Sequence, residues 1–430
     1  MSILKFAENF SMKVFKFGGA SIRDAASVRN VFNVLKHYRN EDLLIVVSAM
    51  GKSTNALESI LESYIKGKKD LSEGIENLRA FHFEILKELF PNKTHRIYNE
   101  VEITLSQLEI ITQTRSEEDY NLLYDKIVPH GEIISTKIIS AFLNDQDYSN
   151  EWLDARKLVK TDKNHRFARV DWEQTQNLIQ EKVKPGKNYV VQGFIASDED
   201  CNSTTLGREG SDYTASIFAY SLNADEVIIW KDVPGILNGD PKVFEKTELL
   251  NQLSFKEAIE LAYYGASVIH PKTIQPLRKK GIPLFVKSFI NSKDPGTRVG
   301  NGLDLEPFLP CFIKKENQAL ITISTKDLAF IVEDHLSKVY NIFHEFGVRV
   351  NLSQNTAVST SFCINNDPII CPKILKALQT EFSTTFNTGA NLFSVRHYDE
   401  KSKMIVKESG KVLLEQISRN TYQVVTIPQE

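Results

Sequence analysis

Four short apolar segments, each followed by a loop of glycine or small polar residues, constrain most strongly how this chain can fold. They lie at residues 14–17, 43–48, 189–195 and 226–230. Their nearly continuous apolar character is typical of strands in a parallel sheet that is covered on both faces. Because helical segments alternate with them, we predict an α/β domain with a mostly parallel sheet sandwiched by helices. Ligands bind beyond the carboxyl ends of such strands, so we expect the four loops to meet at one site.

Two of these loops have the composition of an anion-binding site. The loop at 205–212 has two glycines, which let the backbone approach a ligand, and Arg208, whose planar guanidinium suits a carboxylate. Ser211 and Asp212 then open an apolar helix, whose free N–H groups favour an anion. The loop at 16–21 repeats this pattern with a lysine. Either loop alone would also fit a plain glycine turn, but together they favour a site for phosphates and a carboxylate.

Length, charge and cysteine content predict a multidomain cytoplasmic protein. The chain has 430 residues, and single hydrophobic cores rarely grow beyond about 250–300 residues. Its formal net charge is -3 with well-mixed charges, which gives no basic patch for nucleic acid or an anionic membrane. The start lacks an apolar leader segment, and no apolar run reaches the roughly 18 residues of a membrane span. The four cysteines show no paired spacing, as is typical of reduced thiols.

The strand and helix pattern predicts one large domain over residues 12–300. A charged stretch at about 57–124 has helical spacing and no strand-like run, so we expect a helical insertion there. Glycine and proline then become frequent from residue 294 to residue 310, which indicates a linker over 301–317.

The remaining residues, 318–430, predict a ferredoxin-like α+β region. Its expected elements are strands at 320–323, 348–350, 357–364 and 392–397 and helices at 336–346 and 374–382. This βαββαβ order forms a first unit over about 319–398. The rest, about 399–430, is a truncated second unit that offers mainly a hairpin at 412–425.

On these motifs the chain resembles the aspartate kinases, members of the amino-acid kinase superfamily that carry C-terminal ACT domains. Residues 16–21 are similar to the family motif Lys-Phe-Gly-Gly-Thr-Ser, with Ala20 in place of the threonine. Residues 205–212 are similar to its Thr-Leu-Gly-Arg-Gly-Gly-Ser-Asp loop, with Glu209 at a variable position. Further matching motifs follow in family order at 130–132, 192–194, 232–236, 240–241, 264–266 and 270–271.

The resemblance implies a monofunctional aspartate kinase of the amino-acid kinase fold with a C-terminal ACT region. Such an enzyme transfers the γ-phosphoryl group of MgATP to the β-carboxylate of L-aspartate, giving 4-phospho-L-aspartate. This is the first step in the biosynthesis of lysine, threonine and methionine. ACT regions pair through their sheets, so the resemblance also implies a homodimer.

The resemblance implies individual roles as well. Lys16 and Asp212 would be catalytic, with Lys16 neutralising the migrating phosphoryl group, although Asp212 would also suit a helix cap. Arg208 would bind the α-carboxylate of aspartate, and Glu132 its ammonium group. The other implied substrate contacts are Thr54, Phe194 and Ser211. The implied ATP contacts are Lys16, Gly18, Gly19, Ser21, Lys231, Asp232, Leu237, Lys242 and Ser267. No residue is assigned to Mg²⁺, and His130 is interpreted as structural, because an ionised carboxylate nucleophile needs no base.

The nucleotide side departs from the family pattern. Lys231, Leu237, Lys242 and Ser267 stand where the family commonly has threonine, tyrosine, arginine and lysine. Two alternatives therefore stay open: a non-catalytic amino-acid-sensing homologue, and a kinase of the same superfamily with another carboxylate substrate. Because the second ACT unit is short, we also expect feedback by lysine or threonine to be weak or absent.

Overall fold

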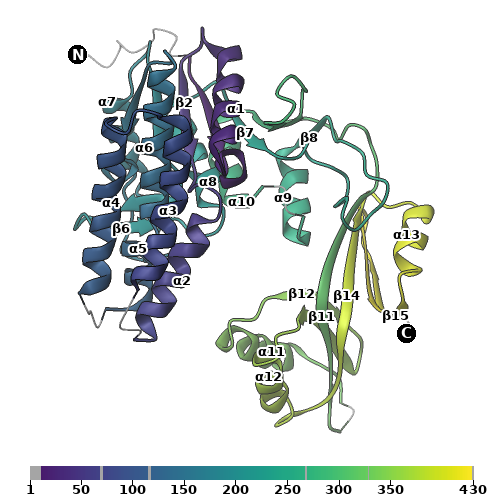
Figure 1. Ribbon diagram of the computed structural model, residues 1–430. Helices are drawn as coiled ribbons and strands as arrows, with labels where there is room; N and C mark the ends of the chain where they lie inside the picture. The colour runs from purple at the N-terminus through teal and green to yellow at the C-terminus, as the bar shows by residue number, and fades with distance from the viewer. Residues whose placement is uncertain (1–10, 68–70, 115–117, 267–268, 328, 429–430) are drawn as a thin grey trace, which may run out of the picture. The chain divides into compact units, whose positions relative to one another are not determined.

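The computed structural model describes residues 11–67, 71–114, 118–266, 269–327 and 329–428, which form two compact units (Figure 1). Unit 1 contains the described residues up to Ile236, together with 249–259 and 269–304. Unit 2 contains 237–248, the described part of 260–268, and the residues from Leu305 onward. No helix of the described residues is long and apolar enough to cross a membrane.

Unit 1 is built on an eight-stranded sheet with the order β3-β4-β2-β1-β7-β9-β10-β8. Its strands are β1 (Lys13–Phe17), β2 (Leu43–Val47), β3 (Asn150–Leu153), β4 (Asn188–Gln192), β7 (Glu226–Lys231), β8 (Gln252–Ser254), β9 (Leu284–Ser288) and β10 (Thr297–Gly300). From β3 to β9 all neighbours run parallel, whereas β10 is antiparallel to β9. Every residue of β2 is buried. The predicted mostly parallel sheet is confirmed.

Helices enclose this sheet (Figure 1). They are α1 (Ala25–Leu35), α2 (Ser53–Ile65), α3 (Ser72–Leu89), α4 (Arg96–Gln113), α5 (Tyr120–Ile127), α6 (His130–Asp145), α7 (Trp172–Lys182), α8 (Gly210–Leu222) and α10 (Pro271–Lys280). A further helix, α9 (Phe255–Tyr264), begins in unit 1 and ends in unit 2. The stretch 57–124 holds most of α2, then α3, α4 and most of α5, with no strand among its described residues. One hydrophobic core joins α1 to α6 with β1 and β2, so the helical insertion is packed against the sheet.

A close backbone approach fixes where α8 begins. Gly193 follows β4 and lies against Ser211 in the first turn of α8. A Cβ atom on Gly193 would lie 2.4 Å from Cβ of Ser211, so no larger residue fits there. Phe194 then adopts φ 72° and donates its N–H to Oγ1 of Thr214 over 2.9 Å. The chain next forms the antiparallel pair β5 (Ile195–Ser197) and β6 (Ser203–Thr205), which leads into the 205–212 loop.

Unit 2 contains a six-stranded antiparallel sheet with the order β12-β13-β11-β14-β16-β15. Its strands are β11 (Cys311–Thr325), β12 (Val350–Asn355), β13 (Ser359–Asn365), β14 (Phe382–Arg396), β15 (Lys411–Ile417) and β16 (Thr421–Ile427). Its helices are α11 (Glu333–Glu345), α12 (Ile370–Leu378) and α13 (Glu400–Lys407). The long strands β11 and β14 pair along their whole length, with register shifts between Lys315 and Leu320 (Figure 1).

The structure differs from the sequence-based expectation at three places in unit 2. The strand expected at 392–397 begins already at Phe382 as β14, and the helix expected at 374–382 lies at Ile370–Leu378. The segment 301–317, expected as a linker, becomes strand β11 at Cys311, because Cys311–Lys315 pair with the end of β14. The segment 399–430 holds helix α13 in addition to the expected hairpin. The first half of β11 and the last half of β14 thus form a second half of the sheet together with β16 and β15. Helix α13 packs against this second half.

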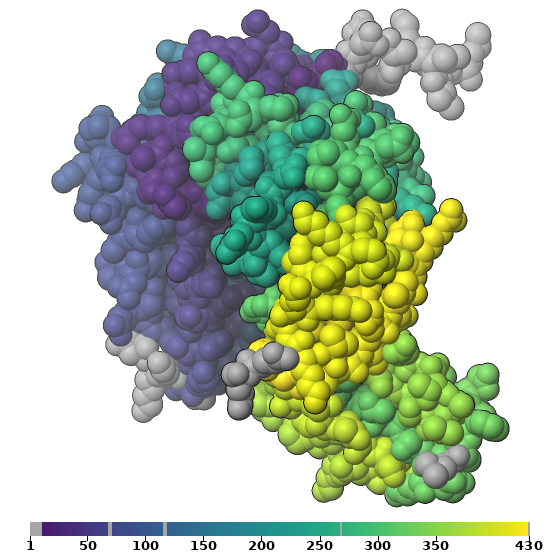
Figure 2. All heavy atoms as spheres, turned by 90° about the vertical axis from the view of Figure 1, so that its right-hand side faces the viewer, coloured from purple at the N-terminus to yellow at the C-terminus, as the bar shows by residue number. Residues whose placement is uncertain are grey.

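Each half of unit 2 has a core of its own. Residues such as Ile321, Phe343 and Ile374 pack beneath α11 and α12, whereas Tyr422, Val424 and neighbouring residues pack beside α13. Figure 2 shows the two halves as separate bulges, one in yellow around α13 and β15 and one in light green around α11 and α12.

Candidate active site

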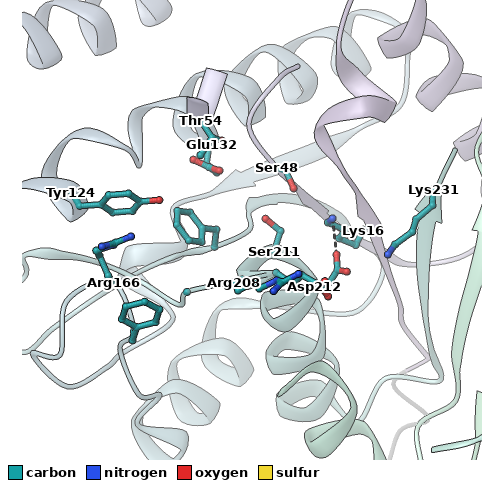
Figure 3. Close-up of a pocket in the computed structure, with 15 residues that line it drawn as sticks. Lys16, Ser48, Thr54, Tyr124, Glu132, Arg166, Arg208, Ser211, Asp212 and Lys231 are labelled. Atoms are coloured by element: carbon teal, nitrogen blue, oxygen red, sulfur yellow. Dashed lines mark ion pairs between the residues drawn. The ribbon is translucent and has the colours of Figure 1, made fainter. Parts of the chain in front are cut away.

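The loops at the carboxyl ends of β1, β2, β4 and β7 surround one pocket of about 610 Å³ in unit 1 (Figure 3). It is lined by Lys16, Ser48, Thr54, Tyr124, Glu132, Arg166, Phe167, Phe194, Gly207, Arg208, Glu209, Gly210, Ser211, Asp212 and Lys231. Its volume lies within the usual range for small-molecule sites, about 300–1,000 Å³. The four strand-end loops therefore meet at one cavity, as the strand pattern predicted.

Eight residues singled out from the sequence line this pocket: Lys16, Thr54, Glu132, Phe194, Arg208, Ser211, Asp212 and Lys231. Four others, Gly18, Gly19, Ser21 and Asp232, are not among its lining residues. Leu237 and Lys242 belong to unit 2, and Ser267 lies outside the described residues. The ATP contacts expected of these seven stay predictions.

A buried ion pair stands at one end of the pocket. Nζ of Lys16 lies 2.6 Å from Oδ1 of Asp212, and the two side chains are only 12% and 4% exposed. Burial alone would raise the pKa of Asp212, but the charges of Lys16 and Lys231 outweigh it and hold that pKa below its usual value. The carboxylate is therefore ionised at neutral pH. Two lysines and one aspartate leave a net positive charge beside the N-terminus of α8, as an anion requires.

The Gly18–Ser21 turn packs tightly against the loop after β2. A Cβ atom on Gly19 would lie 2.9 Å from the carbonyl oxygens of Ala49 and Gly51. Ser21 is buried, and its N–H donates to the carbonyl of Gly18 over 2.9 Å. This close packing holds the loop after β1 against the loop after β2.

Glu132 is a buried carboxylate with an open acceptor position. It lies in the first turn of α6, is 3% exposed, and its Oε2 has no hydrogen-bond partner among the described residues. Burial raises the pKa of Glu132 to about 8, although backbone hydrogen bonds at Glu132 and Ala49 act in the opposite direction. A buried carboxylate of this kind is stabilised in its ionised form when a cationic ligand binds to it.

His130 lies beside Glu132 in the sequence, but it does not line the pocket. Its Nδ1 is 2.9 Å from the carbonyl oxygen of Ile127, and burial lowers the pKa of His130 to about 4. The ring is therefore neutral at physiological pH and held by the backbone. These contacts support its interpretation as a structural residue.

Residues that sequence reasoning missed form the wall around Tyr124. The hydroxyl group of Tyr124 donates a hydrogen bond to Oε1 of Glu58 over 2.8 Å. The guanidinium carbon of Arg166 lies 4.7 Å from the centroid of the Tyr124 ring. Phe167 follows Arg166, and Ser48, which also lines the pocket, directly follows β2. Ser48 could have been found as a polar residue at a strand end. The others come from α5 and from the loop before α7, where no periodic pattern marks them.

Comparison with known proteins gives consistent results. A model described as the amino acid kinase family matches residues 11–288. Lysine-sensitive aspartokinase 3 of Escherichia coli is 33% identical over 361 residues, which cover 82% of this chain and 78% of that protein. Chloroplastic aspartokinase 1 of Arabidopsis thaliana is 32% identical over 82% of this chain, which spans 63% of the plant protein.

Two crystal structures of E. coli aspartokinase III share the fold of this chain. One is a complex with lysine and aspartate in a T-state, and the other is a complex with aspartate and ADP in an R-state. Their TM-scores are 0.81 and 0.80, at 27% sequence identity. Each comparison covers 97% of this chain and 96% of the crystallised chain.

Proposed function

The chain belongs to the amino acid kinase family, and we propose that it is an aspartate kinase, which transfers the γ-phosphoryl group of ATP to the β-carboxylate of L-aspartate. The observation that carries this proposal is the polarity of one pocket. It has a cationic end at Lys16 and Lys231 and a buried carboxylate at Glu132, whose Oε2 has no hydrogen-bond partner among the described residues. Relatives named aspartokinases, and the E. coli enzyme crystallised with aspartate and ADP, support both substrates.

The acceptor end has complementary groups for an amino acid. Arg208 offers a bidentate guanidinium for the α-carboxylate, and ionised Glu132 accepts the α-ammonium group. Thr54 and Ser211 add hydroxyl groups, while Phe194 closes the pocket wall. The β-carboxylate is then left as the nucleophile, and it is already ionised at neutral pH, so no general base is required.

The cationic end suits the transferring phosphoryl group. The attacking carboxylate oxygen forms a bond to the γ-phosphorus as the bond to the leaving ADP oxygen breaks, giving 4-phospho-L-aspartate and ADP. Negative charge on the equatorial oxygens is stabilised by Lys16, by Lys231 and by the N-terminus of α8. Asp212 positions Lys16 through the 2.6 Å ion pair.

Mg²⁺ would enter this site with the nucleotide. The described residues contain no group of three or more His, Cys, Asp or Glu side chains that could hold a metal ion. This fits Mg²⁺, which is usually bound through substrate phosphates and one or two carboxylates. Glu209 and Asp212 are the carboxylates of the 205–212 loop that would contact it. When bound, the ion would neutralise phosphate charge.

We predict that the purified protein phosphorylates L-aspartate in an ATP- and Mg²⁺-dependent reaction, measured by trapping the product as aspartyl hydroxamate. Lys16→Ala should lower kcat by about 10²- to 10³-fold, because it removes charge stabilisation in the transition state. Lys66→Ala, which changes an exposed lysine of the helical region, is the matched control. If the wild-type protein formed no more hydroxamate than Lys16→Ala, this result would contradict the proposed kinase activity and favour the amino-acid-sensing alternative.

A second prediction separates substrate binding from chemistry. Arg208→Lys keeps the charge but loses the bidentate fork, so the KM for aspartate should rise by about 30- to 150-fold. This corresponds to about 2–3 kcal/mol, the strength of a hydrogen bond to a charged group. The kcat should change much less. A variant in which only the KM for ATP rises would contradict the assignment of this loop to aspartate.

A third prediction concerns pH. Because burial raises the pKa of Glu132 to about 8, its carboxyl group is mostly protonated below that pH when no cation is bound, and only its ionised form accepts an ammonium group. The ionised fraction grows as pH rises, so kcat/KM for aspartate should increase about tenfold per pH unit up to about pH 8 and then level off. Glu132→Gln should have a low, flat profile. A wild-type profile that is flat from roughly pH 6 to pH 9 would exclude this role of Glu132.

We also propose a homodimer that pairs through the ACT-like region, with weak feedback by lysine or threonine. The second half of this region has one helix, α13, among its described residues, whereas a complete βαββαβ unit has two. Initial rates should fall less than about twofold at millimolar lysine or threonine, compared with the roughly 5- to 150-fold of typical allosteric couplings. Strong inhibition at saturating aspartate, abolished by changes near Phe346–Val348, would contradict weak feedback. A monomer in light scattering would contradict the dimer.

A further inference from the structure

One buried carboxylate behind the pocket wall joins two of the segments that form it. Asp125 lies in α5 and is fully buried, but it is not among the residues that line the pocket. Its Oδ2 accepts a hydrogen bond from the N–H of Arg166 at 3.0 Å and lies 2.9 Å from Nδ1 of His165. Its Oδ1 accepts a hydrogen bond from the hydroxyl group of Thr205 at 2.6 Å. These partners are between 40 and 80 residues away in the sequence.

The two segments that Asp125 joins also contact each other directly. The N–H of Ala168 donates to the carbonyl oxygen of Thr205 over 3.1 Å. A Cβ atom on Gly207 would lie 3.0 Å from Cδ1 of Phe167, and Gly207 has φ 77°, so both the approach and the conformation favour glycine. The segment before α7 therefore packs against the start of the loop that carries Arg208.

The backbone at Arg166 shows that this arrangement is held against a local cost. Its φ is 68°, in the left-handed region that residues with a Cβ atom rarely adopt. Such residues persist where the surrounding contacts fix the backbone, and they cluster at ligand sites. Asp125 supplies one of these contacts, and Tyr124 supplies another, because its ring lies above the Arg166 guanidinium (Figure 3). Helix α5 thus holds Arg166 by both its backbone and its side chain.

A carboxylate at position 125 costs stability unless it has a specific use. Burial raises the pKa of Asp125, although the contacts of its side chain with Thr205, Arg166 and His165 act in the opposite direction. The folded protein therefore holds the ionised carboxylate less easily than water does. An apolar residue would avoid this cost, but it would leave the N–H of Arg166 and the hydroxyl group of Thr205 without this acceptor. The need for a carboxylate thus comes from the two segments that it joins.

Different side chains hold the two ends of the loop that carries Arg208. At its far end, the close approach of Gly193 to Ser211 fixes the start of α8. At its near end, the hydroxyl group of Thr205 is bound to the buried carboxylate. Arg208 lies between these two anchors, so its position depends on both. Asp212 follows the second anchor, so its position in α8 depends mainly on that one.

We propose that Asp125 is a positioning residue, which holds the segment before α7 and the start of the Arg208 loop in one fixed arrangement. It contacts no substrate and acts through the backbone that presents Arg208. This inference rests on the proposed function, in which Arg208 binds aspartate. It adds that a residue behind the pocket wall controls the affinity for aspartate, while the chemistry at Lys16 and Asp212 is largely independent of it.

The test removes one hydroxyl group at a time from two neighbouring, fully buried threonines of β6. Thr205→Val deletes the hydroxyl group that binds Asp125, with little change in shape. Thr204→Val is the matched control, because it deletes a hydroxyl group that lies 2.7 Å from the hydroxyl group of Thr161 instead. The Kd for aspartate is measured by calorimetry without ATP, and KM and kcat are measured with the hydroxamate assay.

Thr205→Val should raise the Kd and the KM for aspartate by about five- to twentyfold, because the loop that presents Arg208 loses one of its anchors. The kcat and the KM for ATP should change by less than about twofold, since the start of α8 keeps its own anchor. Thr205→Ser keeps the hydroxyl group and should restore the affinity for aspartate. Thr204→Val should leave that affinity unchanged.

Two changes at position 125 give a second measurement. The amide oxygen of Asp125→Asn can still accept the N–H of Arg166, and its NH₂ group can donate to Oγ1 of Thr205. Its Kd for aspartate should therefore stay within about threefold of that of wild type. Asp125→Leu offers neither group and should weaken binding at least as much as Thr205→Val. Thermal unfolding shows whether each variant folds, and if Asp125→Leu does not, the two threonine variants decide the question.

An unchanged Kd for aspartate in Thr205→Val, or equal losses in Thr205→Val and Thr204→Val, would overturn the proposal and indicate a contact that serves stability alone. A rise in the KM for ATP as large as the rise for aspartate would also contradict it. A wild-type protein that binds aspartate but forms no hydroxamate would refute the proposed kinase activity. The role of Asp125 in aspartate binding would then still be decided by the calorimetric comparison.

Discussion

The buried ion pair between Lys16 and Asp212 is the interaction on which the rest of the site depends. It joins the first strand of the chain to the first turn of α8, far apart in sequence. Charges removed from water are stable only when each has a close partner, and losing one partner of a buried pair typically costs about 3–5 kcal/mol. The pair therefore fixes the end of β1 against the start of α8 at the edge of the pocket. The glycine contact at Gly193 and the packed turn at Gly19 hold the same two segments from their other sides.

The two ends of the pocket favour ligand groups of opposite charge. Its cationic end has an ionised aspartate that is kept charged by two lysines. Its other end has a glutamate whose charge is disfavoured until a cation arrives. The difference arises from partners rather than from residue type, since both carboxylates are buried. An acceptor with an ammonium group at one end and a carboxylate at the other matches this arrangement.

Much of the fold could be predicted from the sequence because the signals were local, whereas Thr54, Glu132 and Phe194 in the pocket lining were identified only through the resemblance to a known family. Continuous apolar strands and glycine-containing loops identified β1, β2, β4 and β7 and the residues that follow them. Arg166 and Phe167 could not be predicted, since their loop is held by contacts of Asp125, which lies in α5 and also binds Thr205 of β6. Tyr124 lies next to Asp125 in α5, where no periodic pattern marks it. The strand at Cys311–Lys315 was hidden for a related reason: its partners lie at the end of β14, and prolines precede it. Contacts between distant segments, which leave no periodic pattern, account for what was missed.

The shared strands of unit 2 have a consequence for synthesis on the ribosome. The start of β11 pairs with the end of β14, so Cys311 has no strand partner until Arg396 has been translated. Until then the first residues of β11 project as an unpaired edge strand from the half around α11 and α12, which is itself completed by the first residues of β14. Such edges recruit other strands and promote aggregation. The growing polypeptide thus passes through a vulnerable window that ends when the final hairpin, β15 and β16, emerges and covers the edge of β14.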